Sequence, residues 1–395
     1  MPLPTPFHAR TSALCESLIF KEWAGYFAVG SYESHPAPEY FAFRNSVGLL
    51  DVSPLYKYEV TGKDSAAFLS YVATRDLREF DTGRVTYACF CDPHGKVIDD
   101  GTIARLDDHR FRATTASPTY GWLERNRRGF DVEIHDVSDS TAALALQGPF
   151  SRAVLEDLIG SAIRELRFFR IASATIAGVD IEISRTGFTG DLGYEIWIPS
   201  ADALPVWDAI VEAGRPHAIQ PAGLDALDVT RIEAGFILQD VDYFSAPRCL
   251  IESRKSSPFE IGLEWTVSLE RDAFVGQAAL RAEKARGSVW QMVGLEISWE
   301  GIERLYNAHG LPPSLSSHAC RLAVPVYIGS RQVGQVTSST WSPILKKYLA
   351  IATVATEHSR PGSDLLVEHT VEYERTSVAA TVVERPFFDP ERKRA

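Results

Sequence analysis

The sequence predicts an α+β region followed by a smaller all-β domain, on three observations. Up to residue 286, segments with strand and helix patterns alternate in mixed order, which is more typical of an α+β protein than of a regular doubly wound sheet. From Val289 onward helical periodicity fades and short strands recur between turn residues, as in a barrel or a sandwich. The 395 residues are too many for one ordinary core. We therefore expect residues 1–286 to form two α+β subdomains and residues 287–395 to form a C-terminal barrel-like domain.

The individual elements follow from periodicity and from turn signals. Alternating apolar residues mark strands, and apolar residues three or four positions apart mark helices. The sequence Asp92-Pro93-His94-Gly95 is a strong turn signal between two strands. The expected helices are 11–20, 36–45, 64–72, one around Trp122, 150–158, 201–213, 223–234 and 278–285. The expected strands are 56–61, 84–90, 97–106, 110–115, 130–137, 141–146, 171–177, 180–184 and 194–198, and then 292–297, 324–328, 332–337, 348–353, 365–367 and 376–383.

Composition excludes several classes of function. The net charge of −12 argues against nucleic acid as the main partner. No apolar run approaches the roughly 18 residues that span a bilayer, and the first residues lack the order of a secretory signal. The five cysteines are irregularly spaced, which fits a reducing compartment. We therefore expect a soluble, cytoplasmic protein without a membrane partner. Cys89 and Cys91 have no second pair, so no metal site is expected.

The segment 183–199 is the most informative stretch of the chain. Its first half is a loop with Gly187, Gly190 and Gly193, and glycine permits positive φ or a close approach of the backbone. Its second half alternates like a strand, which places Glu195 and Trp197 on one face. A carboxylate beside an indole would suit a flat, nitrogen-rich heterocycle. The alternative is a glycine-rich turn into an edge strand, with the glutamate facing water.

Two further motifs place charge where apolar residues are expected. In the helix 223–234, Arg231 follows Leu224 and Leu227 on one stripe. It either reaches into a cavity to meet an anion or pairs with Asp228 on the surface, where such a pair contributes about 0.2–0.5 kcal/mol.

The pair Asp99-Asp100 lies early in a strand, so that one carboxylate can point inward while the other stays in water. An inward carboxyl has a raised pKa unless it is paired. The alternative is that the two aspartates lie at the end of a strand and both contact water. The dinucleotide, phosphate-loop, zinc-helix and serine-elbow motifs are all absent.

Five segments together resemble the aminomethyltransferase family, that is, the glycine-cleavage T-protein and its tetrahydrofolate-dependent relatives. Residues 185–195 (RTGFTGDLGYE) are similar to the family's T-G-Y-T-G-E-x-G-[YF]-E, and residues 223–235 (GLDALDVTRIEAG) to G-L-G-A-R-D-x-L-R-L-E-A-G. Residues 95–100 (GKVIDD) resemble G-G-V-I-D-D, residues 337–343 (TSSTWSP) resemble T-S-G-x-x-S-P, and residues 46–53 (SVGLLDVS) resemble A-G-x-F-D-V-S. The five matches occur in the family's order and span nearly the whole chain.

The resemblance implies an α+β fold with a clover-like, three-part folate-binding region and a C-terminal all-β barrel-like domain. It places the catalytic aspartate on Asp99 and the pterin-binding glutamate on Glu195. It also places folate-binding positions on Arg231, on Tyr87 and, through a loose alignment, on Arg392. The implied cofactor is tetrahydrofolate, and the implied reaction moves a methyl or methylene unit from a small donor to its N5. A small methyl or aminomethyl donor and a lipoyl carrier protein are the implied partners.

The match is weaker where the donor or the carrier would enter. The N-terminal stretches 24–32 and 40–44 differ from the glycine-cleavage pattern, Ala116 replaces an asparagine, and the loop after Gly235 is longer. A tetrahydrofolate-dependent O-, S- or N-demethylase that forms 5-methyltetrahydrofolate is therefore an alternative. A non-catalytic folate-binding regulatory protein is a further alternative, but its K-G-C-[YF]-x-G-Q-E segment reads EAGFILQD at 233–240. A fused oxidase is disfavoured because no flavin-binding half accompanies the folate motifs.

Overall fold

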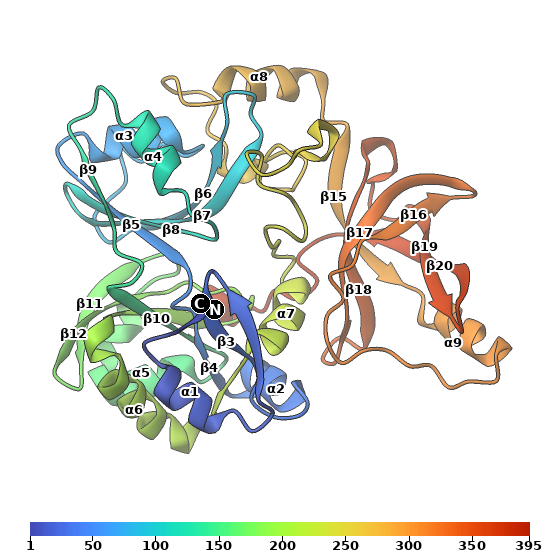
Figure 1. Ribbon diagram of the computed structural model, residues 1–395, viewed down its shortest axis with the longest axis horizontal. Helices are drawn as coiled ribbons and strands as arrows, with labels where there is room; N and C mark the ends of the chain where they lie inside the picture. The colour runs from blue at the N-terminus through green and yellow to red at the C-terminus, as the bar shows by residue number, and fades with distance from the viewer.

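The computed structural model describes residues 1–395 as three lobes, each built around its own β-structure (Figure 1). Two lobes come from the N-terminal part of the chain, and the third is a closed barrel formed by the C-terminal part. The predicted fold class, α+β with a C-terminal barrel, is therefore confirmed. None of the helices is long and apolar enough to cross a membrane.

The first lobe is a five-stranded antiparallel sheet in the order β6-β7-β8-β5-β9. The predicted turn joins β6 to β7: the side chain of Asp92 accepts the N–H groups of His94 and Lys96, both at 2.9 Å. Helices α3 and α4 share a core of 17 buried residues with the sheet. The bounds are β5 Tyr56–Thr61, α3 Ser65–Val72, β6 Val85–Cys91, β7 Val97–Asp107, β8 Arg110–Thr115, α4 Tyr120–Asn126 and β9 Glu133–Asp136.

The second lobe is a six-stranded sheet in the order β11-β12-β13-β10-β4-β14, with helices α5 and α6 on one face. The predicted alternation in β13 is confirmed, because Tyr194, Ile196 and Ile198 lie in the 21-residue core beneath these helices. The bounds are β4 Val47–Asp51, β10 Thr141–Gln147, α5 Ser151–Ile159, β11 Ile171–Ile176, β12 Val179–Ser184, β13 Gly193–Pro199, α6 Ala203–Gly214 and β14 Ile219–Pro221.

A small N-terminal sheet, ordered β1-β3-β2, packs beside this lobe together with α1, α2 and α7. The helix predicted over 11–20 begins earlier and is shorter, and residues from Ile19 onward form a strand that pairs with β3. The bounds are β1 Leu3–Pro4, α1 His8–Leu14, β2 Ile19–Trp23, β3 Tyr26–Ser31, α2 Ala37–Asn45 and α7 Leu224–Glu233.

The third lobe is a six-stranded closed barrel in the order β15-β18-β17-β16-β19-β20. Closure leaves no sheet edge exposed. Helix α9, which the sequence pattern did not predict, begins after Ser298, whose hydroxyl accepts the N–H of Gly301 at 3.1 Å. Helix α8 (Gln277–Arg286) lies against the first lobe, where Leu280 packs with residues of β6 and β7, and it precedes the barrel (Figure 1). The bounds in the barrel are β15 Trp290–Ile297, α9 Trp299–Ala308, β16 Val324–Ile328, β17 Arg331–Ser342, β18 Lys347–Ala355, β19 Asp364–Val371 and β20 Glu374–Val383.

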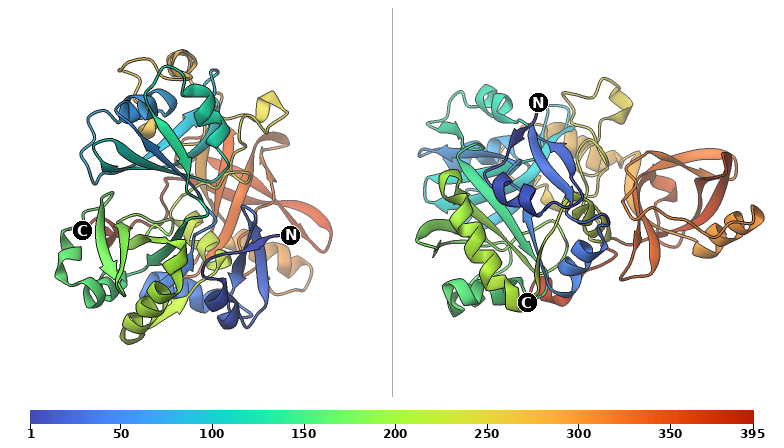
Figure 2. Two further views of the ribbon diagram at one scale, coloured as in Figure 1. Left: turned by 60° about the vertical axis from the view of Figure 1, so that its left-hand side comes forward. Right: turned by 60° about the horizontal axis from the view of Figure 1, so that its bottom comes forward.

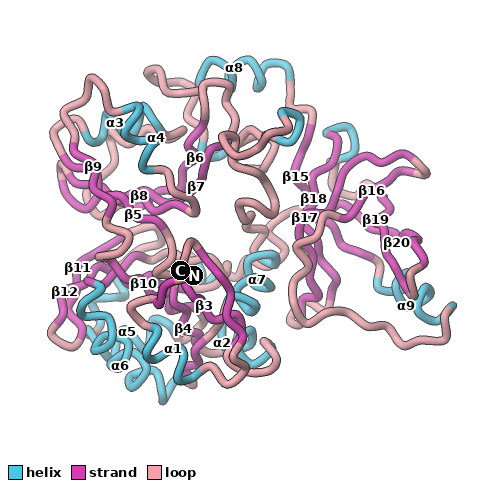
Figure 3. The backbone as a smooth tube through the Cα atoms, viewed as in Figure 1, coloured by secondary structure: helices cyan, strands magenta, loops and turns pink.

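Two features of this arrangement position the site. The sheets of the first two lobes face each other, because one hydrophobic cluster contains Val85 and Ala104 from the first and Ala145 and Trp197 from the second. The segment between α7 and α8 is loop almost throughout (Figure 3). It covers another part of the same face of the first sheet, the part that carries Tyr87, Cys89 and Cys91. After β20 the chain returns to the second lobe (Figure 2), where the N–H of Phe388 donates to the carbonyl of Glu233 at 2.8 Å.

Candidate active site

Asp99 and Asp100 lie in β7 and are both buried, with 0% and 6% of their surface exposed. The prediction that one carboxylate stays in water is therefore wrong. Successive residues of a strand do point to opposite faces, but β7 is an interior strand of its sheet. The loop between α7 and α8 covers the face that we expected to be solvated, and its Tyr243 bonds directly to Asp100.

The Asp99 carboxyl is surrounded by hydrogen-bond donors. Its Oδ1 accepts the Asp100 N–H at 2.9 Å. The side-chain amide of Gln239 donates to the same oxygen at 2.7 Å in the orientation that satisfies both ends of that amide. Its Oδ2 accepts the Ser117 N–H at 3.0 Å and the Thr119 hydroxyl at 2.8 Å. Burial, and then the charge of Asp100, nevertheless raise the pKa of Asp99 to about 8. A fixed carboxyl that titrates near neutral pH can both accept and return a proton.

Asp100 is held by two tyrosine hydroxyls, which donate from Tyr87 on β6 and from Tyr243. Burial raises the pKa of Asp100, and these two hydrogen bonds oppose the rise. The ring of Tyr87 stacks near Trp265, with 6.1 Å between centroids. Tyr87 was predicted to contact the pterin; here its hydroxyl fixes the carboxylate next to Asp99, and the pterin contact stays a prediction.

Glu195 lies on β13 and shares a sheet face with Trp197, as the alternation predicted. Its Oε2 accepts the hydroxyl of Thr186, and no other side-chain donor contacts the carboxylate. Burial raises the pKa of Glu195, while Thr186 and the charge of Arg112 lower it. The guanidinium of Arg112, on β8, lies 4.4 Å from the centroid of the Trp197 ring. The carboxylate is therefore partly buried, beside an indole, and free to accept further N–H groups.

Gly187, in the loop before β13, and Gly193, the first residue of β13, make room for Gln147, the last residue of β10. A Cβ on Gly187 would lie 2.0 Å from the Gln147 side-chain oxygen, and one on Gly193 would lie 2.2 Å from it. The Gln147 amide donates to two backbone carbonyls of the segment 186–194 at 3.2 Å. Of the three glycines in the motif, Gly190 has positive φ, at 76°. The close approach of Gln147 thus explains why Gly187 and Gly193 are glycines. The group that approaches them is a side chain of the protein itself.

Arg231 is buried between α7 and the barrel, with 1% of its surface exposed. Its Nε donates to Asp228 at 2.7 Å, as the surface alternative expected, but this pair is not on the surface. Its other nitrogens donate to Asp242 at 2.6 Å and to the hydroxyl of Ser338 on β17 at 2.7 Å. The residue joins three segments of the chain in this structure, and its contact with folate stays a prediction.

Arg392 forms a two-pronged ion pair with Asp191, at 2.7 and 2.8 Å. The carboxylate is fully buried and the arginine is partly exposed. The pair fastens the C-terminal segment to the loop that precedes β13. The predicted role of Arg392 toward folate also stays a prediction, and what the structure adds is the position of this arginine beside the glycine motif.

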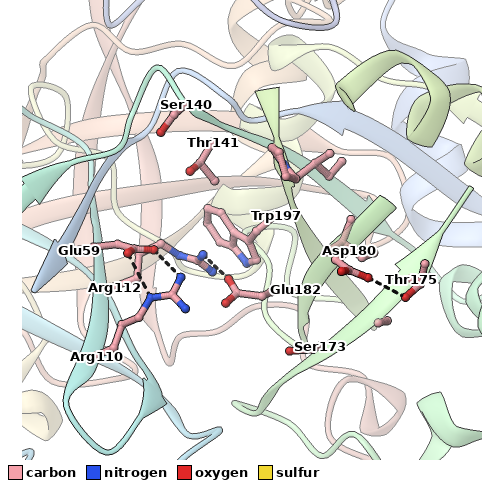
Figure 4. Close-up of a pocket in the computed structure, with 14 residues that line it drawn as sticks. Glu59, Arg110, Arg112, Ser140, Thr141, Ser173, Thr175, Asp180, Glu182 and Trp197 are labelled. Atoms are coloured by element: carbon pink, nitrogen blue, oxygen red, sulfur yellow. Dashed lines mark hydrogen bonds and ion pairs between the residues drawn. The ribbon is translucent and has the colours of Figure 1, made fainter. Parts of the chain in front are cut away.

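A cavity of about 620 Å³ opens between β5 and β8 of the first lobe and β10 to β13 of the second (Figure 4). Ion pairs join Glu59 to Arg110 at 2.7 Å and Arg112 to Glu182, with the indole of Trp197 behind them. None of the five predicted site residues lines this cavity. Its inner wall, formed by Arg112 and Trp197, is the layer of side chains next to Glu195.

β8 connects the two carboxylates of the site. It carries Arg112 toward Glu195, and its C-terminal end leads into Ser117 and Thr119, which bind Asp99. Sequence reasoning did not identify the residues that orient the two carboxylates, namely Thr186, Arg112, Ser117, Thr119, Gln239 and Tyr243. Thr186 stands within the recognised motif and could have been found there. Gln239 and Tyr243 lie in a loop, where no periodicity marks them.

Comparison with known proteins matches most of this chain to one family. A family model for the GCVT N-terminal domain matches residues 7–271, and one for the glycine cleavage T-protein C-terminal barrel domain matches residues 314–389. Trimethylamine-oxide aldolase from Ruegeria pomeroyi is 36% identical over 408 residues, and the match covers 100% of this chain and 48% of that protein. This chain therefore spans about half the length of that relative.

Aminomethyltransferase from Halalkalibacterium halodurans is 31% identical over 355 residues, and the match covers 89% of each protein. Among solved structures, the glycine cleavage system aminomethyltransferase T from Bartonella henselae superposes with a TM-score of 0.83. That superposition covers 98% of this chain and 99% of the other, at 23% identity, and shows a shared fold.

Proposed function

This chain belongs to the glycine cleavage T-protein (aminomethyltransferase) family, and we propose that it is a tetrahydrofolate-dependent one-carbon transferase. The proposed reaction moves a methyl or methylene unit from a small donor to N5 of tetrahydrofolate, with Asp99 as the catalytic carboxyl. The bound folate would supply the amine nitrogen that takes up the one-carbon unit. The residues of the chain would bind, orient and protonate the reactants.

The observation that carries the proposal is the environment of Asp99. Four donors fix both of its oxygens, and its pKa of about 8 lets it hold or release a proton near neutral pH. A positioned acid–base group of this kind is typically worth about 10²–10⁴-fold in rate. A purely structural carboxylate would more commonly be paired with a cation, and Asp99 has no ion-pair partner. This favours catalysis over the alternative of a non-catalytic folate-binding regulatory protein.

Glu195 fits the predicted role of pterin ligand. Its carboxylate accepts one side-chain hydrogen bond and keeps capacity for the N–H groups of a pterin ring. A hydrogen bond to a charged acceptor contributes about 1.5–3 kcal/mol. Tyr87, Arg231 and Arg392 stay proposed folate contacts on the strength of the family resemblance.

Two donor classes remain in the proposal. Relatives named aminomethyltransferase support an aminomethyl donor, for which a lipoyl carrier protein would be a partner. The relative named trimethylamine-oxide aldolase matches the whole of this chain, and its name supports a methylated nitrogen compound as the donor. The second class corresponds to the N-demethylase alternative, and it agrees with the departures near Ala116 and in the loop after Gly235.

The test is turnover of tetrahydrofolate with a panel of donors: an aminomethyl lipoyl carrier, methylated amines and amine oxides, methyl sulfides and methoxy compounds. Products are separated by chromatography and identified by mass as 5-methyl- or 5,10-methylene-tetrahydrofolate. Asp99→Asn should lose about 10²–10⁴-fold in rate and keep its affinity for folate. Asp107→Asn, an exposed change at the far end of the same strand, is the matched control. Equal rates for Asp99→Asn and wild type would refute the assignment.

A further inference from the structure

A chain of three hydrogen bonds connects Trp197 to Glu195 on one face of the second sheet. The indole Nε1 donates to the hydroxyl of Ser184 at 3.1 Å. The hydroxyls of Ser184 and Thr186 lie 2.7 Å apart, and the hydroxyl of Thr186 donates to Glu195 Oε2. Ser184 stands directly opposite Glu195 in the pairing of β12 with β13. The two ends of the chain are thus two residues apart on one strand, and its middle comes from the neighbouring segment.

The chemistry of the two ends gives the chain a direction. An indole N–H can only donate, and an ionised carboxylate can only accept. Thr186 must therefore give its proton to Glu195, and Ser184 must give its proton to Thr186. If Glu195 were protonated at Oε2, Thr186 could turn toward Ser184, and the remaining acceptor for Ser184 would be the Glu195 carbonyl at 3.5 Å. Ionised Glu195 therefore fixes the direction of the chain, and the charge strengthens the hydrogen bond that Oε2 accepts.

Arg112 holds the Trp197 indole, the first donor of the hydrogen-bond chain, in place. Its side chain is 4% exposed, lies over the Trp197 ring and pairs with Glu182 on β12. A cation over an aromatic face is held by the ring quadrupole. Arg112 is also the charged group that acts on the carboxyl of Glu195. The other charged groups of the cavity wall are the Glu59–Arg110 pair, which stands farther along β5 and β8, and Asp180, which accepts the hydroxyl of Thr175.

We propose that Trp197, Ser184 and Thr186 are positioning residues that keep the Glu195 carboxylate ionised and turned so that Oε1 faces the ligand. The inference rests on the proposed function, because the ligand is the pterin ring of tetrahydrofolate. The chain occupies Oε2 and leaves Oε1 without a donor from the protein. It also opposes the effect of burial, which favours the neutral, donor-bearing form of a carboxyl.

The test compares four variants with wild type: Thr186→Val, Ser184→Ala, Trp197→Phe and the control Thr175→Val. Thr175 lines the same cavity, and its hydroxyl donates to Asp180 at 3.0 Å, outside the chain. The dissociation constant of tetrahydrofolate is measured from pH 5 to 8, together with the thermal midpoint of each variant. Binding should fail as the pH drops through the pKa of Glu195, because the protonated carboxyl cannot accept the pterin N–H groups.

Loss of a link raises that pKa, so binding should fail at a higher pH. We expect a shift of about one pH unit for Thr186→Val, the equivalent of a tenfold change in the ionisation constant. Ser184→Ala and Trp197→Phe should shift the midpoint by progressively less, and the control should not shift it. If Ser184→Ala and Trp197→Phe both match the control, the chain has no positioning role.

A second readout separates this inference from the proposed function. The pKa of Glu195 in the free protein can be measured by NMR of a carboxyl-labelled sample, with Glu195→Gln to assign the signal. It should rise in Ser184→Ala relative to Thr175→Val, whether or not folate binds. Absence of folate binding in wild type would overturn the proposed function. An unchanged pKa of Glu195 in Ser184→Ala would overturn the proposed positioning role of the hydrogen-bond chain.

Discussion

The substitution Asp99→Asn should change the free energy of unfolding more favourably at pH 8 than at pH 5. In the folded chain this carboxyl keeps its proton up to about pH 8, whereas its ordinary pKa is 3.8. Between these values the folded state binds one more proton than the unfolded state, so wild-type stability falls as the pH rises. Each pH unit lowers the free energy of unfolding of the wild type by about 1.4 kcal/mol, so the three units from pH 5 to pH 8 lower it by about 4 kcal/mol.

The measurement is urea unfolding of wild type and Asp99→Asn at pH 5 and at pH 8, followed by tryptophan fluorescence. An asparagine does not titrate, and the hydrogen bonds that it loses or gains are the same at both pH values. The difference in unfolding free energy between variant and wild type should therefore move by about 4 kcal/mol in favour of the variant. A difference that stays constant within about 1 kcal/mol would show that Asp99 ionises normally in the folded protein, and the argument for its acid–base role would fail.

Three further changes test other parts of the structure. Arg231→Met should cost roughly 3–5 kcal/mol in urea unfolding, because it leaves the buried carboxylate of Asp242 without its ion-pair partner; a loss under about 1 kcal/mol would contradict the buried junction. Gly193→Ala should lower stability by roughly 1–3 kcal/mol, since its Cβ would meet the fixed amide of Gln147, and an unchanged thermal midpoint would show that the loop yields. Arg112→Met removes a nearby positive charge and should raise the pKa of Glu195, so tetrahydrofolate binding should be lost at a higher pH than in wild type as the pH falls; an unshifted profile would exclude this charge effect.

Local pattern was enough to predict the elements that carry the site. Alternation from Tyr194 to Ile198 located β13, because Tyr194, Ile196 and Ile198 enter the core beneath α5 and α6 while Glu195 and Trp197 lie on the opposite face. The turn at Asp92 to Gly95 located the hairpin whose second strand holds Asp99. The five motif matches gave the family, which the comparison along residues 7–271 and 314–389 confirms.

What local pattern could not supply was the set of long-range partners. Tyr243 is 143 positions from Asp100, and it decides that this second aspartate is buried as well as the first. The barrel residue Ser338 is 107 positions from Arg231 and helps to hold the arginine between lobes. Helix α9 was missed because it interrupts a run of strands, and its tryptophan and isoleucine residues suit either structure. Such features depend on which lobes meet, and periodicity carries no information about that.

Calorimetric titration of tetrahydrofolate shows whether the protein binds folate through Glu195. The titration compares wild type with Glu195→Ala and with Glu133→Ala, an exposed change on β9 that serves as the control. Binding by wild type and the control, with a loss of tenfold or more in Glu195→Ala (about 1.4 kcal/mol), is the predicted result. Absence of binding in wild type, or equal affinity in all three proteins, would contradict a folate site built on Glu195.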